Sequence, residues 1–235
     1  TFDEQMKIIS NNAIPKEALA NLRKVGDVLS IETEGITYSA ISGHPDVFFC
    51  VVDNILITAP NIPNGVIQQL AKLNIDFIYG DSQLGGKYPD SAKYNVVVTD
   101  SFLIHNLNVT DDKIKNMCLG RTAIHVNQAY TRCNLLPLAN NKFITSDMGI
   151  YDTLQRCGID VLYVDPKQIS LPGFNNGFFG GACGVYQNNI YVIGSLSEFG
   201  PGREVSEFLK KNKYNIVELY NGPVYDGGSL LFIED

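Results

Sequence analysis

The sequence is short of the residues on which several protein classes depend. It contains no tryptophan, three histidines and five cysteines, and no two cysteines form a CxxC pair. Neither a disulfide framework nor a thiol-based zinc motif is therefore predicted. Residues 1–5 lack the basic region and apolar stretch of a signal peptide. No apolar run approaches the roughly twenty residues that cross a bilayer, so we expect a cytoplasmic protein with no membrane partner.

Positive charge is also scarce. The chain has 18 Lys and Arg residues against 25 Asp and Glu, a net charge of −7, which disfavours the phosphate backbone of a nucleic acid as partner. The three histidines stand far apart, so no metal and no other cofactor is predicted. The glycine-rich residues 177–184 lack both the Lys-Ser/Thr pair and the following helix of a phosphate-binding loop.

What the sequence does contain is one pattern repeated five times in 235 residues, or about every 47 residues. Each unit has an amphipathic helix, a buried strand, a long loop and a β-hairpin with an Asx-rich turn. The helices are predicted at residues 14–24, 63–73, 111–118, 148–157 and 202–211, and the strands after them at 27–31, 74–79, 122–126, 158–163 and 214–219. The hairpins are predicted at 47–52/55–59, 96–99/101–105, 134–138/142–145 and 184–187/190–194, with a last single strand at 229–233.

An ordinary α/β sandwich is the alternative interpretation, but a doubly wound parallel sheet would lack these recurring hairpins. The sequence therefore predicts one domain over residues 1–235, a five-bladed, pseudo-fivefold α/β propeller of ββαβ units. Its loops should converge on a site at the central axis. The last strand lacks a return strand, and we expect the apolar residues 5–10 to pair with it and cover its edge.

Six strings of residues resemble a known superfamily. They are LGGKYP (84–89), QAYTRC (128–133), LPGF (171–174), GFFGG (177–181), NGP (221–223) and DGGS (226–229). On these strings the chain resembles a bacterial branch, without an assigned reaction, of the pentein superfamily of guanidine-group-modifying enzymes. That superfamily includes arginine deiminases, dimethylarginine dimethylaminohydrolases and amidinotransferases. The resemblance covers nearly the whole chain and implies a pentein fold.

The resemblance also implies a nucleophilic cysteine just after a Gly-rich turn, at or near the last core strand. Here the turn ends at Gly228 and is followed by Ser229. Aligning residues 130–136 with 225–231 places Cys133 level with Gly228, so Cys133 is the best candidate nucleophile, with Arg132 beside it in sequence. His44 is the candidate general acid–base group. Asp226 is the carboxylate best placed to clamp a guanidinium.

Further residues of the axial loops are predicted to bind the substrate: Asp46, Tyr88, Tyr94, Asn95, Asn134, Cys183 and Ser229. Each candidate has a structural alternative. For Cys133 and Cys183 the alternative, which the sequence favours, is a small buried core thiol. His44 fits a loop residue at a strand end, and Asp226 fits an Asx-turn that binds its own backbone.

Two functions follow from this pattern. The first is an enzyme of hydrolase or amidinotransferase type that acts on a guanidino or amidino compound in an axial pocket. The second is a catalytically inactive pentein that serves as a small-molecule or protein binding module, as the ribosome anti-association factor of eukaryotes and archaea does. The serine at the family's cysteine position favours the second, and the Gly-, Tyr- and Asp-rich loops favour a small-molecule pocket.

Overall fold

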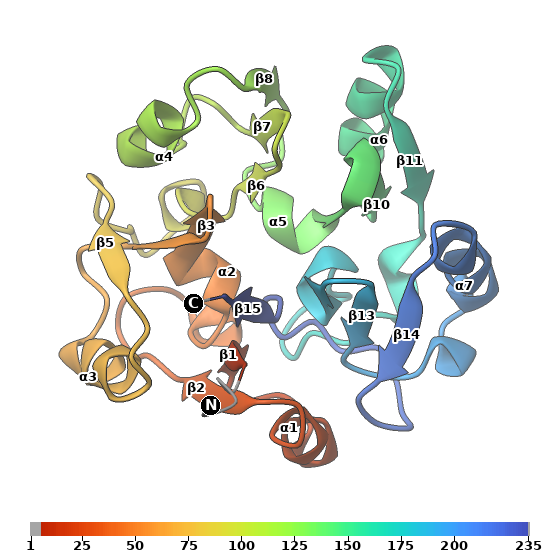
Figure 1. The fold of residues 1–235 in the computed structure, drawn as a ribbon, viewed down its shortest axis with the longest axis horizontal. Helices are drawn as coiled ribbons and strands as arrows, with labels where there is room; N and C mark the ends of the chain where they lie inside the picture. Colours follow the sequence, from red (N-terminus) through yellow and green to blue (C-terminus); the bar gives the residue numbers. More distant parts are fainter. Residues whose placement is uncertain (1–5, 235) are drawn as a thin grey trace, which may run out of the picture.

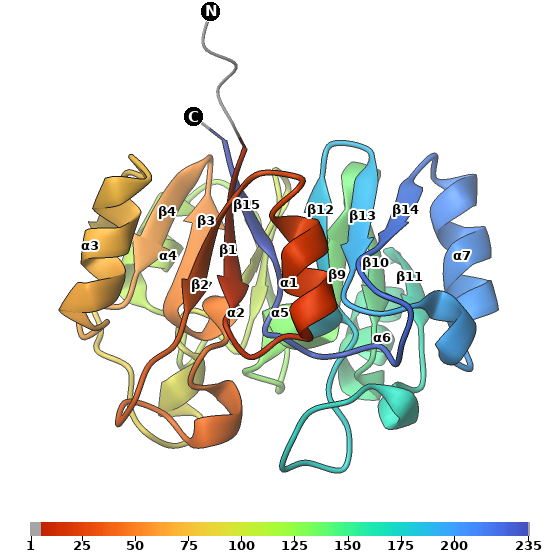
Figure 2. The ribbon, with the colours of Figure 1, turned by 90° about the horizontal axis from the view of Figure 1, so that it is seen from below.

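The structure is a computed structural model that describes residues 6–234. Five three-stranded sheets stand around a common centre, each with one helix on its outer side (Figure 1). The hairpin turns point to the end at which the two termini lie, and the long loops, including those at 32–44 and 164–179, project at the other end (Figure 2). None of the helices within residues 6–234 is long and apolar enough to span a bilayer.

Four of the sheets are built from strands that are consecutive in sequence. Each consists of an inner strand, an antiparallel middle strand and a parallel outer strand. These sheets are β3 (Phe49–Val52), β4 (Ile55–Thr58) and β5 (Phe77–Tyr79); β6 (Val97–Val98), β7 (Phe102–His105) and β8 (Thr122–His125); β9 (Leu135–Leu138), β10 (Lys142–Thr145) and β11 (Asp160–Tyr163); and β12 (Cys183–Tyr186), β13 (Asn189–Val192) and β14 (Asn215–Glu218).

The fifth sheet joins the two ends of the chain. β1 (Lys7–Asn11) lies between β15 (Leu231–Ile233), with which it is antiparallel, and β2 (Asp27–Ile31), with which it is parallel. The prediction that the N-terminal strand covers the last strand is therefore confirmed. Gln5, its predicted first residue, lies outside the described residues.

The five outer helices pack through one apolar stripe each, as their periodicity predicts. They are α1 (Lys16–Leu22), α3 (Asn64–Lys72), α4 (Asp112–Met117), α6 (Met148–Arg156) and α7 (Gly202–Lys211). Four of them bury a pair of residues spaced by four, which places both side chains on the face toward the sheet: Ala18 and Leu22, Val66 and Leu70, Ile150 and Leu154, and Val205 and Leu209.

The hairpins differ from the prediction at their inner ends. Residues 47–48 and 134, predicted as strand, belong to the short helices α2 (Pro45–Phe48) and α5 (Thr131–Asn134). Pro45 occupies the first position of α2, where its fixed φ favours a helical turn and its missing N–H costs nothing. These two short helices change the direction of the chain just before it enters β3 and β9.

Two hairpin turns have the left-handed backbone that their Asx residues predict. Asp53 and Asn54 have φ values of 50° and 61°, and Asn140 and Asn141 have values of 58° and 56°. The tight turns hold each inner strand against its middle strand and so fix the position of the segment before it.

His105, at the end of β7, gives a pH-dependent test of the fold. Its ring is buried, with Nε2 donating to the carbonyl of Ala129 and Nδ1 against the Thr110 hydroxyl, both at 2.7 Å. Burial lowers the pKa of His105 to about 4, below the ordinary value of about 6.5. As the pH falls from 6.5 toward 4, His105 therefore binds a proton in the unfolded chain but not in the folded chain. The protein loses stability in that pH range.

We expect wild-type protein to lose about 2 kcal/mol more stability between pH 7 and pH 4.5 than a His105→Gln variant. Urea unfolding at both pH values measures this difference. His125→Gln, at an exposed position on the neighbouring strand, is the comparison variant and should keep most of the loss of stability, because the His105 ring stays buried. Equal pH slopes for wild type and His105→Gln would contradict the assignment.

Candidate active site

Five segments of the chain meet at the centre of the molecule, each just before the inner strand of its sheet. They are α2, the residues after η2 (Asp90–Ala92), α5, η5 (Gly180–Ala182) and the turn at 226–229. Hydrogen bonds join each segment to the next and the last to the first, so that the five are linked in a ring. The bonds run from Asp46 N to Gly228 O (3.0 Å), Asn95 Nδ2 to Asp46 O (3.1 Å), Arg132 N to Asn95 O (3.1 Å), the Arg132 guanidinium to Gly180 O (2.9 Å) and Ser229 N to Gly181 O (2.7 Å).

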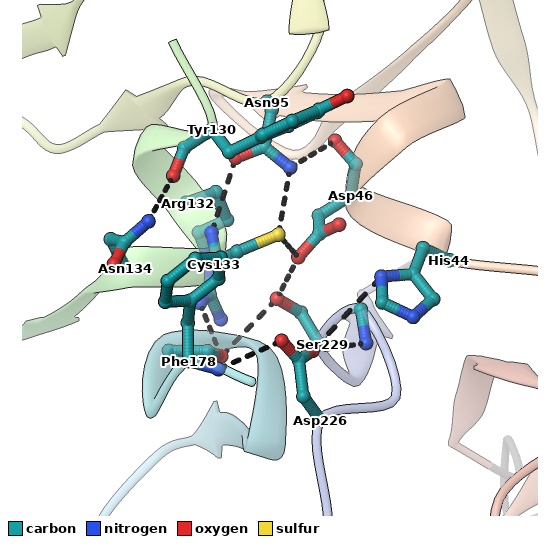
Figure 3. Close-up of polar contacts among 12 residues, drawn as sticks. His44, Asp46, Asn95, Tyr130, Arg132, Cys133, Asn134, Phe178, Asp226 and Ser229 are labelled. Atoms are coloured by element: carbon teal, nitrogen blue, oxygen red, sulfur yellow. Dashed lines mark hydrogen bonds and ion pairs between the residues drawn. The ribbon is translucent and has the colours of Figure 1, made fainter. Parts of the chain in front are cut away.

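The carboxylate of Asp46 lies inside this ring and connects three repeats. Its Oδ2 accepts the thiol of Cys133 at 3.1 Å and the hydroxyl of Ser229 at 2.5 Å (Figure 3). The Asn95 amide donates to Cys133 Sγ at 3.1 Å, and Asn95 Oδ1 accepts the backbone N–H of Cys133 at the same distance. All four residues are buried. Sequence-predicted residues from four different repeats therefore form one polar cluster.

His44 and Asp226 lie beside this cluster. The Nδ1 atom of His44 stands 4.0 Å from Asp226 Oδ1, and both side chains are buried. The carboxylate of Asp226 accepts the N–H of Gly228 at 3.0 Å and that of Phe178 at 2.9 Å. The first of these bonds is the Asx-turn that was one interpretation of Asp226. Burial raises the pKa of Asp226 to about 6, the nearby His44 opposes this rise, and Asp46 adds to it.

The thiol of Cys133 is held in its protonated form. Burial raises its pKa well above the ordinary value, and the negative charges of Asp46 and Asp226 raise it further. Arg132 does not supply the neighbouring cation that a reactive thiolate needs, because its guanidinium donates to the carbonyls of Gly180 and Cys183. Residues 131–134 are helical rather than extended, and Arg132 serves as a link in the ring.

Three polar atoms of the cluster have no hydrogen-bond partner within residues 6–234: Nδ1 and Nε2 of His44 and Oδ1 of Asp46. Buried polar atoms are normally paired, so unpaired ones call for an explanation. One ligating atom from each of His44, Asp46 and Cys133 lies within 4.8 Å of the others. Together they offer an imidazole, a carboxylate and a thiol, which are the three ligand types of protein-bound transition metals.

Three of the predicted substrate-binding residues, Tyr94, Asn134 and Cys183, have partners outside the cluster at Asp46. The hydroxyl of Tyr94 donates to Ser82 O at 2.6 Å and lies 3.2 Å from Asp111, because the ring packs under Gly80. The Asn134 amide donates to Tyr130 O and accepts from Ser146 within its own hairpin. Cys183 packs in a hydrophobic cluster, where burial raises its thiol pKa.

Tyr88 lies at the outer edge of the site, and a chain of aromatic residues leads inward from it. Its ring is 49% exposed and lies 5.4 Å from that of Tyr130. The Tyr130 hydroxyl contacts Ser91 at 2.5 Å and the hydroxyl of Tyr38 at 3.0 Å. Tyr38 packs 5.8 Å from Phe174 on the loop at 164–179. Sequence reasoning missed Tyr38 and Tyr130 as site residues, although Tyr130 stands three positions before Cys133.

The glycine string 177–181 is explained by how closely this segment wraps the cluster. A Cβ atom on Gly180 would lie 2.4 Å from the carbonyl oxygen of Arg132 and 2.7 Å from that of Cys133. A Cβ atom on Gly181 would lie 2.0 Å from Oδ1 of Asp226. Only glycine permits η5 to lie directly against the backbone of α5 and against Asp226.

We expect Gly180→Ala to destabilise the protein by about 1–3 kcal/mol, because the methyl group meets backbone atoms that cannot rotate away. Gly65→Ala is the matched control, since its Cβ would meet nothing within 4 Å on helix α3. It should be neutral or stabilise by up to about 1 kcal/mol. Urea unfolding of the two variants measures the difference, and equal effects would show that η5 can move away from α5 without cost.

The structure resembles solved enzymes of very different sequence. The amidinotransferase SxtG from Microseira wollei, of the saxitoxin biosynthetic pathway, has a TM-score of 0.55 and 11% identity, covering 98% of this chain and 94% of that one. A Cys-to-Ser variant of the C. jejuni agmatine deiminase with substrate bound has a TM-score of 0.58 and 10% identity, with the same coverage. The dimethylarginine dimethylaminohydrolase of Pseudomonas aeruginosa, complexed with citrulline, has a TM-score of 0.52 and 7% identity and covers 91% of both chains.

At such low identities the likeness establishes the fold. No protein with a curated description matches the sequence. A family model, described as a family of unknown function (DUF6873), matches residues 8–231. The chain belongs to this family, and its fold is that of the pentein superfamily, as the sequence strings implied.

Proposed function

We propose that the protein binds a small cationic guanidino or amidino compound at the axial cluster and that Cys133 attacks its central carbon. One observation carries the proposal. The buried thiol of Cys133 lies 3.1 Å from the carboxylate of Asp46, and the other oxygen of that carboxylate has no partner within residues 6–234. The geometry therefore combines a nucleophile with an anchor for a planar cation.

Charge supports a cationic ligand. Asp46 and Asp226 are both buried, and the negative charge of Asp46 raises the pKa of Asp226. Within residues 6–234, the guanidinium of Arg132 donates to the carbonyls of Gly180 and Cys183. Its charge acts on Asp46 and Asp226 through space, but it donates no hydrogen bond to either carboxylate and leaves Oδ1 of Asp46 open. A ligand guanidinium would offer donors in a planar fork that matches a carboxylate, and its charge would relieve the repulsion between the two acids.

The same cation would activate the thiol. The carboxylates of Asp46 and Asp226 raise the pKa of Cys133. A positive charge bound between them would lower the pKa of this thiol. The thiol proton would pass to His44, which has a ring nitrogen within 4.8 Å of the Cys133 sulfur, and attack of the thiolate on the amidine carbon would form a tetrahedral adduct. His44 would then give this proton to the departing amine as the bond between the carbon and that amine breaks. Water then releases the product in a hydrolase, and a second amine does so in an amidinotransferase.

The structural neighbours support this substrate class, since the solved relatives include an amidinotransferase, an agmatine deiminase and a dimethylarginine dimethylaminohydrolase. The nucleophile would come from a different repeat than the resemblance implies. Ser229 stands at the family's cysteine position, donates to the same oxygen of Asp46 as Cys133 does, and so faces the thiol across one carboxylate. We also infer that the ring of hydrogen bonds closes the five sheets into one propeller domain. We propose separately that the protein is cytoplasmic.

A binding protein without catalysis is the second candidate. The raised pKa of Cys133 and the serine at position 229 favour it. Such a protein would be stabilised by a guanidino ligand without converting it. Thermal unfolding with and without the ligand, together with product analysis, separates the two functions.

Labelling with 2-chloroacetamidine tests the proposal directly. The reagent is a cationic amidine that alkylates thiols, and 2-chloroacetamide is its neutral counterpart of nearly equal size. We expect Cys133 to react with the amidine at least about 10-fold faster than with the amide, after correction for their rates with a free thiol, because the buried carboxylates attract the cation by more than about 1.4 kcal/mol. Peptide mass spectrometry over time identifies the modified cysteine.

Asp46→Asn should reduce the ratio of the amidine rate to the amide rate by about 30-fold or more, since loss of a buried charged partner costs about 2–5 kcal/mol. The ratio is the readout because loss of the Asp46 charge also changes the pKa of the Cys133 thiol, which affects both rates alike. Cys183→Ser is the control, because this second buried thiol lies outside the cluster, and it should label as wild type does. Equal corrected rates for the two reagents in wild-type protein would remove the guanidino proposal.

A further inference from the structure

The donor set at the axis has a property that recognition of a guanidinium does not explain. A guanidinium only donates hydrogen bonds, so it can use the free oxygen of Asp46 and one ring nitrogen of His44. Both nitrogens of His44 lack a hydrogen-bond partner within residues 6–234, with Nδ1 4.0 Å from Asp226, and the ring is buried. One ligating atom each of His44, Asp46 and Cys133 lies within 4.8 Å of the other two.

We propose that His44, Asp46 and Cys133 form a binding site for a divalent transition metal of borderline softness, of which Zn²⁺ is the model. One imidazole, one carboxylate and one thiolate suit such an ion, and they disfavour Mg²⁺ and Ca²⁺, which take oxygen ligands. Tetrahedral bonds of about 2.0–2.3 Å place neighbouring ligand atoms roughly 3.5 Å apart. The three side chains therefore need to close by only about an ångström to hold the ion.

Two buried side chains beside the cluster support this ligand set. The Asp226 carboxylate lies 4.0 Å from the Nδ1 atom of His44, so a second negative charge stands close to the position of the ion (Figure 3). Ser229 donates to Oδ2 of Asp46 and would fix the orientation of the ligating carboxylate.

Binding would exchange the thiol proton for the metal ion. The Cys133 thiol now donates that proton to Asp46, and it would be released to solvent as the Sγ–metal bond forms. The sulfur would then no longer be a free nucleophile. The metal-bound state is thus distinct from the guanidine-binding state of the proposed function, and neither proposal depends on the other.

Metal titration of a Cys157→Ser protein tests the site, since Cys157 is the exposed cysteine and would otherwise bind metal on its own. Equilibrium dialysis against Zn²⁺ should give one ion per chain. The Co²⁺ form should show a sulfur-to-cobalt charge-transfer band and the intense visible bands of tetrahedral cobalt. X-ray absorption of the Zn²⁺ form should show one sulfur at about 2.3 Å with nitrogen or oxygen neighbours at about 2.0–2.1 Å.

Adding Cys133→Ser should abolish the charge-transfer band. Adding His44→Gln should weaken metal binding by at least about 10-fold. Removing a residue that only supports a metal ligand already costs about that much, and His44 would be a ligand itself. Adding Cys183→Ser should change neither. A band that survives Cys133→Ser, a zinc environment without sulfur, or no binding at micromolar Zn²⁺ would overturn the proposal. If a variant fails to fold, the spectra of the Cys157→Ser protein alone decide between these outcomes.

The chloroacetamidine experiment keeps the two proposals separable. It is run on chelator-treated protein, so a metal cannot mask the thiol, and the metal titration contains no amidine. Selective labelling without a sulfur–metal band would leave the guanidino function standing and remove the metal site. A sulfur–metal band without selective labelling would remove the guanidino function and leave the metal site.

Discussion

The ring of hydrogen bonds among the five segments before the inner strands is the constraint on which the rest of the structure depends. Each bond uses a buried donor or acceptor that would be costly to leave unpaired, so no segment can shift without breaking its link to the next. Asp46 shows this most clearly, because its backbone N–H and C=O belong to the ring and its carboxylate faces inward. The same bonds that hold the repeats together therefore aim the site residues at one another.

Repetition explains why side chains from different repeats reach one point. The five segments occupy equivalent positions around one centre, and four of them place a polar side chain in the cluster at Asp46. A thiol on α5 and a hydroxyl on the turn at 226–229 consequently reach the same oxygen of Asp46. The fold therefore fixes where these side chains meet, and the residue type in each repeat decides which polar group it contributes.

The centre is buried, acidic and incompletely paired. Burial strengthens the repulsion between Asp46 and Asp226. Within residues 6–234, both nitrogens of His44 and Oδ1 of Asp46 have no hydrogen-bond partner. A bound cation would reduce the repulsion between the two carboxylates and give the unpaired atoms a partner. A guanidinium would do so through hydrogen bonds, and a metal ion would do so through coordination. Beside this centre, the hydroxyl of Tyr38 contacts that of Tyr130, and the ring of Tyr38 packs against Phe174.

Local patterns in the sequence determined the repeats, the pairing of the N-terminal strand with the last one and the candidate residues His44, Asp46, Asn95, Cys133, Asp226 and Ser229. Periodicity and Asx turns act over a few residues, so they can be recognised without knowing the fold. Only the tertiary structure decided that these six side chains meet, that Tyr94, Asn134 and Cys183 turn elsewhere, and that Arg132 links the ring instead of activating the thiol. The direction of a side chain at a shared axis depends on short helices such as α2 and α5 and on contacts between residues up to 183 positions apart, which no local pattern encodes.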